Sequence, residues 1–412
     1  MRRLQLWVLT FIVHGCIAWL TSCNISDNPV SPKQPASKVV SGGFFSSAVN
    51  KLIDENYEQL KTKSWAELRI PAKLFDHTAF AIPANAAGDM DYVVKAGYHT
   101  FVNGGAVRDA IMGKAANDID FSTEALPEQL VEIVPNTKLF TAPNGYVVAQ
   151  AWHGDKECTD MGTMRAIYWF MRGKPGIPES SNPVTGTSLN VYSKNLWEDS
   201  YSRALTINAL YYDYQTGDIL DFHGGLHDLR EGIIRTVVNP DVMFPNSSTD
   251  LLRAVRLAAR YNFTIEPVTD AGIRKHLPAC DALGASGIAY HLIKGFHDGN
   301  MSVTYRLYKE YGFLGRYFHM LKDVLDTKEY EDYIVKTYAK LDKQHCKDTP
   351  TTLGALFLPV IQKAMGDKEW TDENLLKVFN DLEASSGQKN YFEISDDIKA
   401  NMCRIWVQQH QP

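Results

Sequence analysis

Residues 103–123 read NGGAVRDAIMGKAANDIDFST, and this stretch decides the fold of the chain. Gly104 and Gly105 follow an apolar run that predicts a strand at 98–102, and they precede a segment of helical character. A tight strand–turn–helix connection points backbone N–H groups and the positive end of the helix at an anion. Arg108 adds a planar cation that suits phosphate. The stretch therefore predicts a phosphate-binding turn.

Two carboxylates follow this turn in the pattern Asp-x-Asp. Asp118 and Asp120 flank Ile119, and a strand at 118–122 would place both on one face, because successive side chains of a strand alternate. Carboxylate oxygens on one face can share divalent cations, and they suit Mg²⁺ or Mn²⁺ bound together with a triphosphate. Either piece alone is common, but their order and spacing together predict a site for a nucleotide and metal ions.

The pattern Gly-Gly-x-Val-Arg-Asp, then Gly, then Asp-x-Asp and Thr resembles the signature of the class II RNA nucleotidyltransferases. These are the bacterial poly(A) polymerases and the CCA-adding tRNA nucleotidyltransferases. The resemblance runs from about Tyr98 to about Leu321 and is closer to bacterial poly(A) polymerase than to the CCA enzymes. Later segments also carry it: Thr-Ile-Asn-Ala-Leu at 206–210, Asp-Phe-His-Gly-Gly-Leu-His-Asp-Leu at 221–229 and Arg-Ala-Val-Arg at 253–256.

The resemblance implies an α/β nucleotidyltransferase head with a mixed sheet, followed by an all-helical neck and body. The periodicities agree independently, with strand patterns at 98–102, 118–122, 145–152, 157–165 and 208–222, and helical patterns at 302–325, 329–342 and 369–384. We expect a signal peptide at 1–22, a flexible tether at 23–47, the head with a helical lead-in at 48–236, and the neck and body at 237–412. The region after about residue 248 should be almost wholly helical.

The resemblance also implies the reaction. The family transfers a nucleoside monophosphate from ATP or another nucleoside triphosphate to an RNA 3′-hydroxyl with two metal ions. It places the metals on Asp118 and Asp120, and the triphosphate against Gly104, Gly105 and Arg108. Asp160 is either a third carboxylate of the site or a solvated strand residue. We expect a monomer whose partners are the nucleotide and an RNA 3′ end.

The second family motif, Arg-Arg-Asp-Phe-Thr-Ile-Asn-Ala, is degraded. Residues 202–209 read SRALTINA, so that Arg203 and Asn208 remain as candidates for nucleotide binding. Ser202 replaces the first arginine. Ala204 replaces the aspartate that the family uses at the active site and near the ribose, and alanine can neither accept a hydrogen bond nor hold a metal.

The motif of the neck helix is degraded as well. The family has Glu-Asp, two residues, Arg, two residues and Arg, and its Asp and first Arg read the base. Without gaps, these three positions hold Asn246, Ser247 and Asp250. Arg253 and Arg256 remain on one side of the helix, where they can contact phosphate or pair with carboxylates. A slipped alignment, which deletes one helical turn, instead uses Asp250 and Arg253 as the reading pair.

Composition sets wide limits. The 412 residues are 45% hydrophobic, which is enough to bury a core in two domains. The net charge of −6 lends no support to RNA binding, although it does not exclude a local basic groove. The four cysteines that follow Cys23, at positions 158, 280, 346 and 403, show no metal-ligand spacing, and we interpret them as buried thiols with one or two disulfides possible after export.

The N-terminus predicts export. Two arginines precede an apolar run at 4–20, and Leu-Thr-Ser-Cys at 20–23 resembles a bacterial lipoprotein signal in which Cys23 becomes the lipidated N-terminus. The Ser-, Pro- and Asn-rich segment 24–47 then serves as a tether. The protein would be a cell-envelope lipoprotein held to the membrane only by its lipid. An uncleaved anchor or a wrongly assigned start codon is the alternative, the latter giving a cytoplasmic protein.

Two functions follow from these observations. The first is an RNA nucleotidyltransferase of the poly(A) polymerase type, which rests on the complete first motif. The second is a catalytically impaired exported lipoprotein that keeps the fold and a phosphate- or RNA-binding site. The second rests on the export signal and on Ala204, Ser247 and Asp250. Nucleoside triphosphates are scarce outside the cytoplasm, so an exported polymerase would lack its donor.

Export and lipidation predict that the full-length protein fractionates with membranes. Because one acyl chain binds a bilayer weakly and two or more bind it firmly, Cys23→Ser should release the protein or leave it unprocessed. Cell fractionation with mass spectrometry of the N-terminus measures both effects. A soluble cytoplasmic protein that begins at Met1 would contradict export, and it would favour the polymerase.

Overall fold

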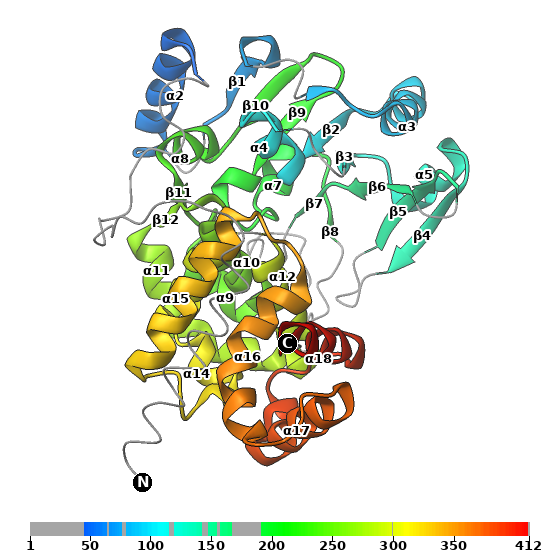
Figure 1. Ribbon diagram of the computed structural model, residues 1–412. Coiled ribbons are helices and arrows are strands. Elements are labelled where there is room, and N and C mark those ends of the chain that lie inside the picture. Colours follow the sequence, from blue (N-terminus) through cyan, green and yellow to red (C-terminus); the bar gives the residue numbers. More distant parts are fainter. Residues whose placement is uncertain are drawn as a thin grey trace. The chain divides into compact units, whose positions relative to one another are not determined.

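The computed structural model describes residues 45–63, 66–75, 80–114, 119–141, 147–154, 157–166, 191–298 and 300–410. The chain divides into two compact units, whose described parts are 45–282 and 283–410 (Figure 1). The sequence places a boundary at 236/237, where strands give way to helices. The boundary between the two compact units lies later, at 282/283, so the first helices of the predicted neck belong to the same unit as the sheet.

An eight-stranded mixed sheet forms the centre of the first unit (Figure 1). In spatial order its strands are β1 (Leu68–Pro71), β10 (Asp218–Asp221), β9 (Leu210–Asp213), β2 (Thr100–Asn103), β3 (Phe121–Thr123), β6 (Cys158–Thr163), β5 (Val147–Trp152) and β4 (Thr137–Thr141). Neighbouring strands are antiparallel except β3 and β6, which run parallel. A further antiparallel pair joins β7 (Arg165–Ala166) to β8 (Val191–Tyr192). The mixed sheet confirms the predicted fold class.

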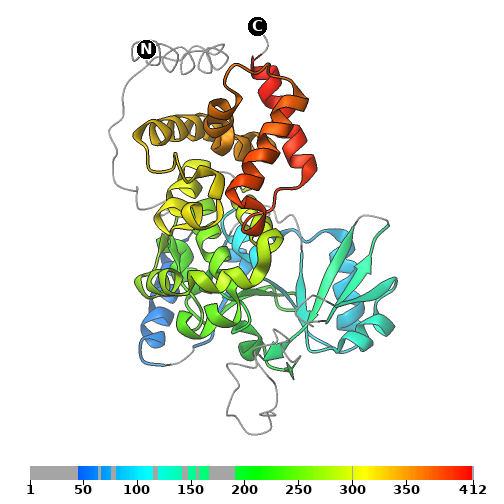
Figure 2. The ribbon, with the colours of Figure 1, turned by 90° about the horizontal axis from the view of Figure 1, so that it is seen from below.

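The helices of this unit lie before, between and after its strands along the chain. They are α2 (Ser47–Leu60), η1 (Ala72–Leu74), α3 (Ala84–Lys95), α4 (Gly105–Ile111), α5 (Pro127–Ile133), α7 (Leu196–Ser200), η4 (Thr206–Asn208), α8 (Gly225–Glu231), α9 (Pro240–Asn246), α10 (Ser248–Tyr261), α11 (Pro267–His276) and η5 (Leu277–Leu283). Figure 2 shows α3 and α5 beside the β4–β6 end of the sheet, which they contact. Ser46 and Asn195 cap α2 and α7 with their side chains, which fixes where these helices begin.

The second unit is helical. It contains α12 (Gly284–His297), α13 (Met301–Glu310), α14 (Phe313–Tyr317), η6 (His319–Leu321), α15 (Lys328–Lys343), α16 (Thr349–Met365), α17 (Asp372–Ser386), η7 (Gln388–Asn390) and α18 (Asp396–His410). This confirms the helical body. Among the described helices of the chain, none combines the length and the apolar character that a bilayer crossing requires.

The structure also corrects some details. The lead-in predicted as helical contains β1, and β4 was not predicted. Most of β4 is exposed, so it lacks the alternation of buried and exposed residues that reveals a strand. Among the described residues after 248, the exception to the helical pattern is β12 (Thr264–Ile265), which pairs with β11 (Ile233–Ile234). The four described cysteines are free, and those at 280 and 403 are buried as predicted, whereas that at 158 is exposed and that at 346 half-buried.

The segment 221–229, which carries the resemblance through DFHGGLHDL, joins β10 to α8. The Asp221 carboxylate is fully buried and accepts backbone N–H bonds from His223 and Gly225 at 3.0 Å and from Leu226 at 2.8 Å. Burial raises the pKa of the Asp221 carboxyl above its ordinary value, and the three N–H bonds offset part of that rise. The carboxylate thus ties the turn to the first residues of α8.

Helix α8 in turn fixes η4. A Cβ atom added at Gly225 would lie 2.2 Å from the carbonyl oxygen of Thr206, so only glycine allows this approach. The Thr206 hydroxyl donates to the buried Asp228 carboxylate at 2.7 Å, and Arg235 donates to the same carboxylate at 2.9 Å. The shared motif at 221–229 is therefore a support for the segment around Thr206.

Gly225→Ala should lower the free energy of unfolding by about 3 kcal/mol, because the added methyl group forces η4 away from α8. Chemical denaturation followed by circular dichroism measures this loss. Gly88→Ala in α3 is the matched control, since no atom lies within 4 Å of the added Cβ. It should raise stability by about 0.5–1 kcal/mol. Equal changes in the two variants would contradict the close packing of Gly225.

Candidate functional site

The turn between β2 and α4 has the form that the sequence predicts. Gly104 has φ 71° and ψ −131°, a conformation that favours glycine, and its N–H donates to the carbonyl of Leu210 at 3.3 Å. A Cβ added at Gly105 would lie 3.3 Å from Nη2 of Arg108. The two glycines therefore let the backbone turn, and they leave room for the arginine side chain beside it.

Arg108 lies at the turn, but protein groups hold it. Its side chain is 5% exposed, and Nε and Nη2 both lie 3.0 Å from Oδ1 of Asp109. Nη1 donates to Oδ1 of Asn208, and the guanidinium carbon lies 4.9 Å from the centre of the Tyr261 ring. Arg108 and Asn208, which the sequence assigns separately to nucleotide binding, are thus bonded to each other. The positive charge is fixed beside the turn.

Of the two predicted metal ligands, Asp118 lies outside the described residues, and Asp120 is exposed immediately before β3. The Asp120 carbonyl accepts the N–H of Asn103 at 3.2 Å, which extends the β2–β3 pairing by one residue. By the alternation of a strand, Asp120 then shares a face of the sheet with Ser122, and Ile119 lies on the opposite face.

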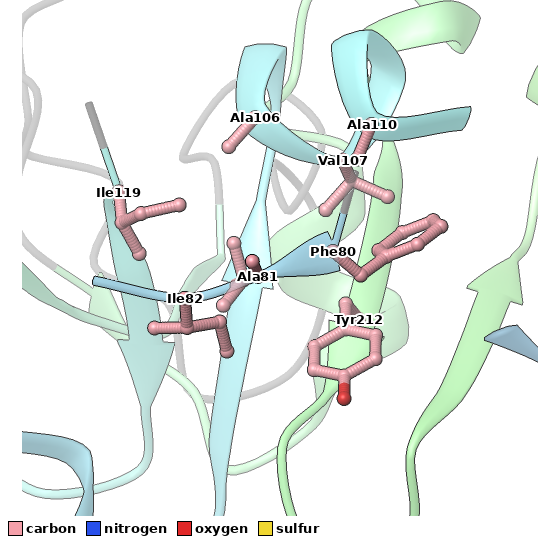
Figure 3. Close-up of a pocket in the computed structure, with 9 residues that line it drawn as sticks. Phe80, Ala81, Ile82, Ala106, Val107, Ala110, Ile119 and Tyr212 are labelled. Atoms are coloured by element: carbon pink, nitrogen blue, oxygen red, sulfur yellow. The ribbon is translucent and has the colours of Figure 1, made fainter. Parts of the chain in front are cut away.

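That opposite face is closed by apolar packing. Figure 3 shows Ile119 and side chains of α4, β9 and the segment 80–82 around a small pocket. Its volume is only about 10 Å³, and its lining is apolar: Phe80, Ala81, Ile82, Val102, Ala106, Val107, Ala110, Ile119 and Tyr212. Such a space holds at most one water molecule. The pocket therefore secures α4 against the back of the sheet, and the polar chemistry lies on the front face with Asp120.

Asp160 lies close to Asp120 across the sheet. Strands β3 and β6 pair in parallel with Phe121 opposite Met161, and one more step in this register places Asp160 beside Asp120. The Asp160 side chain is partly exposed, and its Oδ1 accepts from Nε2 of Gln150 at 3.0 Å. Within the described part of the chain, no three His, Cys, Asp or Glu side chains gather closely enough to hold a metal ion.

A buried network lies on the same face. The Asp199 carboxylate, 1% exposed, accepts from Nη2 of Arg203 and from the Tyr211 hydroxyl, both at 2.8 Å. Arg203 also donates from Nη1 to Oδ1 of Asn103 at 2.8 Å and from Nη2 to Oγ of Ser122 at 2.7 Å. The network thereby joins β2, β3, β9 and α7 beside Asp120.

The ionised state of this network follows from its charges. Burial alone would lower the pKa of the Arg203 guanidinium, but the Asp199 carboxylate outweighs it and raises that pKa. Burial alone would likewise raise the pKa of Asp199, and Arg203 lowers it. Burial and the Asp199 charge raise the pKa of the Tyr211 hydroxyl well above its ordinary value. The pair is therefore charged, and the phenol stays protonated as a donor.

The sequence assigns Arg203 to the nucleotide, whereas the structure shows its guanidinium bonded mainly to protein. Its partners Asn103, Ser122 and Asp199 were not predicted. Two of them could have been found, because Asn103 begins the opening stretch and Ser122 follows Asp120 by one strand period. Asp199 gave no comparable signal.

Ala204 stands where the family has an aspartate, and its surroundings suit a small side chain. It is 3% exposed, and its φ of 21° is unusual for alanine. Its carbonyl accepts the N–H of Val237 at 3.0 Å. A carboxylate at this position would be buried and would need a partner.

The neck helix α10 begins at Ser248, directly after Ser247. The Ser247 hydroxyl donates to Oδ2 of Asp250 at 2.7 Å, and Nη1 of Arg253 donates to Oδ1 of the same carboxylate. Arg253 is 42% exposed and Arg256 is half-buried. Asp250 and Arg253 therefore form a pair one helical turn apart, as the slipped alignment requires, and Ser247 bonds to that pair.

The comparisons with known proteins agree with this geometry. Residues 100–235 match the family model described as the poly A polymerase head domain. Over 230 residues the chain is 30% identical to poly(A) polymerase I of Salmonella typhimurium, which covers 56% of this chain and 49% of that protein. These matches support the class II RNA nucleotidyltransferase family. This confirms the resemblance.

Two further similarities extend the comparison. The chain is 33% identical over 184 residues to a CCA-adding enzyme of Bacillus licheniformis, which covers 45% of this chain and 43% of that protein. Its fold is similar to that of a Thermotoga maritima CCA-adding enzyme complexed with tRNA, with a TM-score of 0.52 and 17% identity over 88% of this chain and 73% of that chain. The chain spans about half the length of the curated relatives it matches.

His223 contacts the C-terminal end of α7. Its Nε2 lies 2.7 Å from the Ser200 hydroxyl, and its ring meets the Tyr201 ring edge-on at 4.7 Å. The Ser200 hydroxyl donates to the Trp197 carbonyl, so Nε2 of His223 carries the proton and donates. Burial lowers the pKa of His223 to about 3. The ring is therefore neutral in the folded protein.

His223 predicts a loss of stability in acid. Between about pH 6.5 and pH 3 the unfolded histidine takes up a proton and the buried one does not, so stability falls as the pH falls. The limiting slope is about 1.4 kcal/mol per pH unit. In His223→Gln, whose amide can still donate to Ser200, this part of the slope should vanish. Urea denaturation at pH 7, 6 and 5 measures it, and identical slopes in parent and variant would contradict the buried neutral state.

Proposed function

We propose that this chain is an RNA nucleotidyltransferase of the poly(A) polymerase type, which transfers a nucleoside monophosphate from a nucleoside triphosphate to an RNA 3′-hydroxyl. The observation that carries the proposal is the front face of the sheet. Exposed Asp120 lies there beside a rigid charged network, with Asp160 on the neighbouring strand and Arg108 fixed at the glycine turn. The family matches support the same reaction.

The carboxylates suit Mg²⁺ or Mn²⁺. Asp118 and Asp120 would hold the ions, and Asp160 is the candidate third ligand. Asp120 is exposed and Asp160 is partly exposed, so their hard oxygen donors can reach a hydrated cation. When bound, the ions would promote ionisation of the RNA hydroxyl and neutralise the departing pyrophosphate.

The other residues bind and orient. The turn at Gly104 brings backbone close to the phosphates, and Asn208 keeps the charge of Arg108 there. Arg203 holds β2, β3 and α7 together, so that the strand bearing Asp120 does not move relative to its neighbours. Arg253 and Arg256 on one side of α10 offer further positive charge to phosphate.

Base selection depends on the neck helix. In the ungapped alignment, Ser247 and Asp250 occupy the positions that read the base, and they bond to each other. No arginine at these positions is then available to form hydrogen bonds with the edge of a base. A site that lacks such groups cannot discriminate strongly. The enzyme should therefore show weak preference among nucleotides. Strong preference for AMP would favour the slipped pair of Asp250 and Arg253.

A second candidate is an exported lipoprotein, anchored through Cys23 in the cell envelope, that binds phosphate or RNA without transfer. The observation that favours it is Ala204, because its buried methyl group stands where the family has a carboxylate. The same assay separates the two functions.

The test incubates purified residues 24–412 with RNA, Mg²⁺ and each labelled nucleoside triphosphate in turn. The protein should extend the RNA with weak nucleotide preference, and Asp120→Asn should lower the rate on the order of 100-fold. Asp396→Asn is the matched control, since Asp396 lies on the other unit and is 98% exposed. It should leave the rate unchanged.

Melting temperatures of the variants separate catalysis from folding, and both should match the parent. A parent protein that binds RNA but transfers no nucleotide would contradict the proposal and favour the lipoprotein. A rate that Asp120→Asn does not alter would mean that Asp120 is not part of the site.

A further inference from the structure

A cluster of cations surrounds Tyr261, the last residue of α10. The side chain is 5% exposed, and its hydroxyl donates to Oδ1 of Asp109 at 2.6 Å. Three positive groups approach the ring: the guanidinium carbon of Arg108 at 4.9 Å, Nζ of Lys114 at 5.2 Å and the guanidinium carbon of Arg260 at 5.2 Å from its centre. Distances of this order allow cation–π attraction.

The contacts of the described residues bring three cations and one carboxylate to the Tyr261 ring. Asp109 is this carboxylate, with Nη2 of Arg260 at 3.8 Å from Oδ2 and Arg108 at 3.0 Å from Oδ1. Three cations thus approach one aromatic ring, and two of them also approach the Asp109 carboxylate, in a chain whose net charge is −6. Like charges held together repel one another, and an anion that binds among them relieves the repulsion. The composition of the cluster thus suits a highly charged anion.

The cluster adjoins the glycine turn. Nη2 of Arg108 lies 3.3 Å from the place of a Cβ at Gly105, and Nη1 donates to Asn208. Lys114 is exposed, and the Arg260 side chain is 33% exposed. A phosphate chain that begins at the turn would therefore meet cations that can reach solvent. Neither Tyr261, Lys114 nor Arg260 stood out in the sequence.

We propose that Tyr261 is a positioning residue that fixes Arg108 at the turn, and that Lys114 and Arg260 bind the phosphate chain of the nucleoside triphosphate. The inference rests on the proposed function only for the identity of the ligand. Tyr261 acts in two ways: its hydroxyl holds Asp109, and its ring face holds the cations. Tyr261→Phe removes the first contact and keeps the second, whereas Tyr261→Leu removes both.

The test is calorimetric titration of the full chain with sodium tripolyphosphate, which carries the charge of the phosphate chain without a base or a sugar. Lys114→Ala and Arg260→Ala should each weaken binding about tenfold, and Lys114→Arg should restore most of the affinity. Tyr261→Phe should weaken binding about threefold and Tyr261→Leu more strongly. Lys95→Ala is the matched control, because Lys95 is exposed and its Nζ lies 6.0 Å from the Tyr92 ring on α3. It should bind as the parent does.

Titration with an RNA oligonucleotide forms the second arm, and the same variants should bind RNA as the parent does. Reduced RNA binding with unchanged tripolyphosphate binding would overturn the proposal, because the cluster would then contact the RNA backbone. If Tyr261→Leu does not fold, the variants of Lys114 and Arg260 still decide the outcome, since removal of these cations leaves the aromatic ring in place. Unchanged tripolyphosphate affinity in both would overturn the proposal.

The two titrations, together with the transfer assay, also distinguish this inference from the proposed transfer reaction. A parent that binds tripolyphosphate through Lys114 and Arg260 but transfers no nucleotide would support the phosphate site and contradict the proposed function. A parent that transfers nucleotide but shows no effect of these variants on the KM for the nucleotide, at constant KM for RNA, would contradict the phosphate site alone.

Discussion

A carboxylate that is almost fully buried must be neutralised, and Asp199 is such a group. Arg203 neutralises it, and in doing so reaches Asn103 on β2 and Ser122 on β3, while Tyr211 on β9 donates to the same carboxylate. One buried charge thus determines how three strands and α7 meet. The exposed carboxylate of Asp120 stands at the edge of this arrangement, so its position depends on the pair.

A second constraint acts on the segment from Arg203 to Asn208, at the end opposite to Arg203. Thr206 is held by Asp228 and by the close approach of Gly225, and two residues later Asn208 bonds to Arg108. The segment from Arg203 to Asn208 is therefore anchored to the sheet at one end and to α4 at the other. This explains how a motif in which Ser202 and Ala204 replace an arginine and an aspartate of the family keeps its conformation: its structural contacts pass through the residues that remain.

The sequence predicts well what local pattern determines. The glycine turn, the hairpin of β9 and β10, and the helical body follow from turn residues and periodicity, and they are present. Strand β4 lacked a buried face and was missed. The relation of Asp160 to Asp120 depends on the parallel register of β3 and β6, which no local pattern encodes.

The long-range contacts of the site were equally beyond the sequence. Asp109 and Tyr261 lie 152 positions apart, and their hydrogen bond joins α4 to the last residue of α10 only in the folded chain. Arg203 was assigned to nucleotide binding from the family motif, which stays a prediction, and the structure shows that Arg203 also supports the site. Its bond to the buried Asp199 carboxylate, which cannot be left uncompensated, depends on the fold and could not be predicted from the motif.

A double-mutant cycle on this pair tests the account most directly. The free energies of unfolding of Asp199→Asn, Arg203→Met and the double variant are compared with that of the parent. Each single change should cost about 3–5 kcal/mol, because it leaves a buried charge without its partner. The double change should cost less than the sum by about 2 kcal/mol or more. Single changes that each cost under about 0.5 kcal/mol, or costs that simply add, would show that the site is not assembled around this pair.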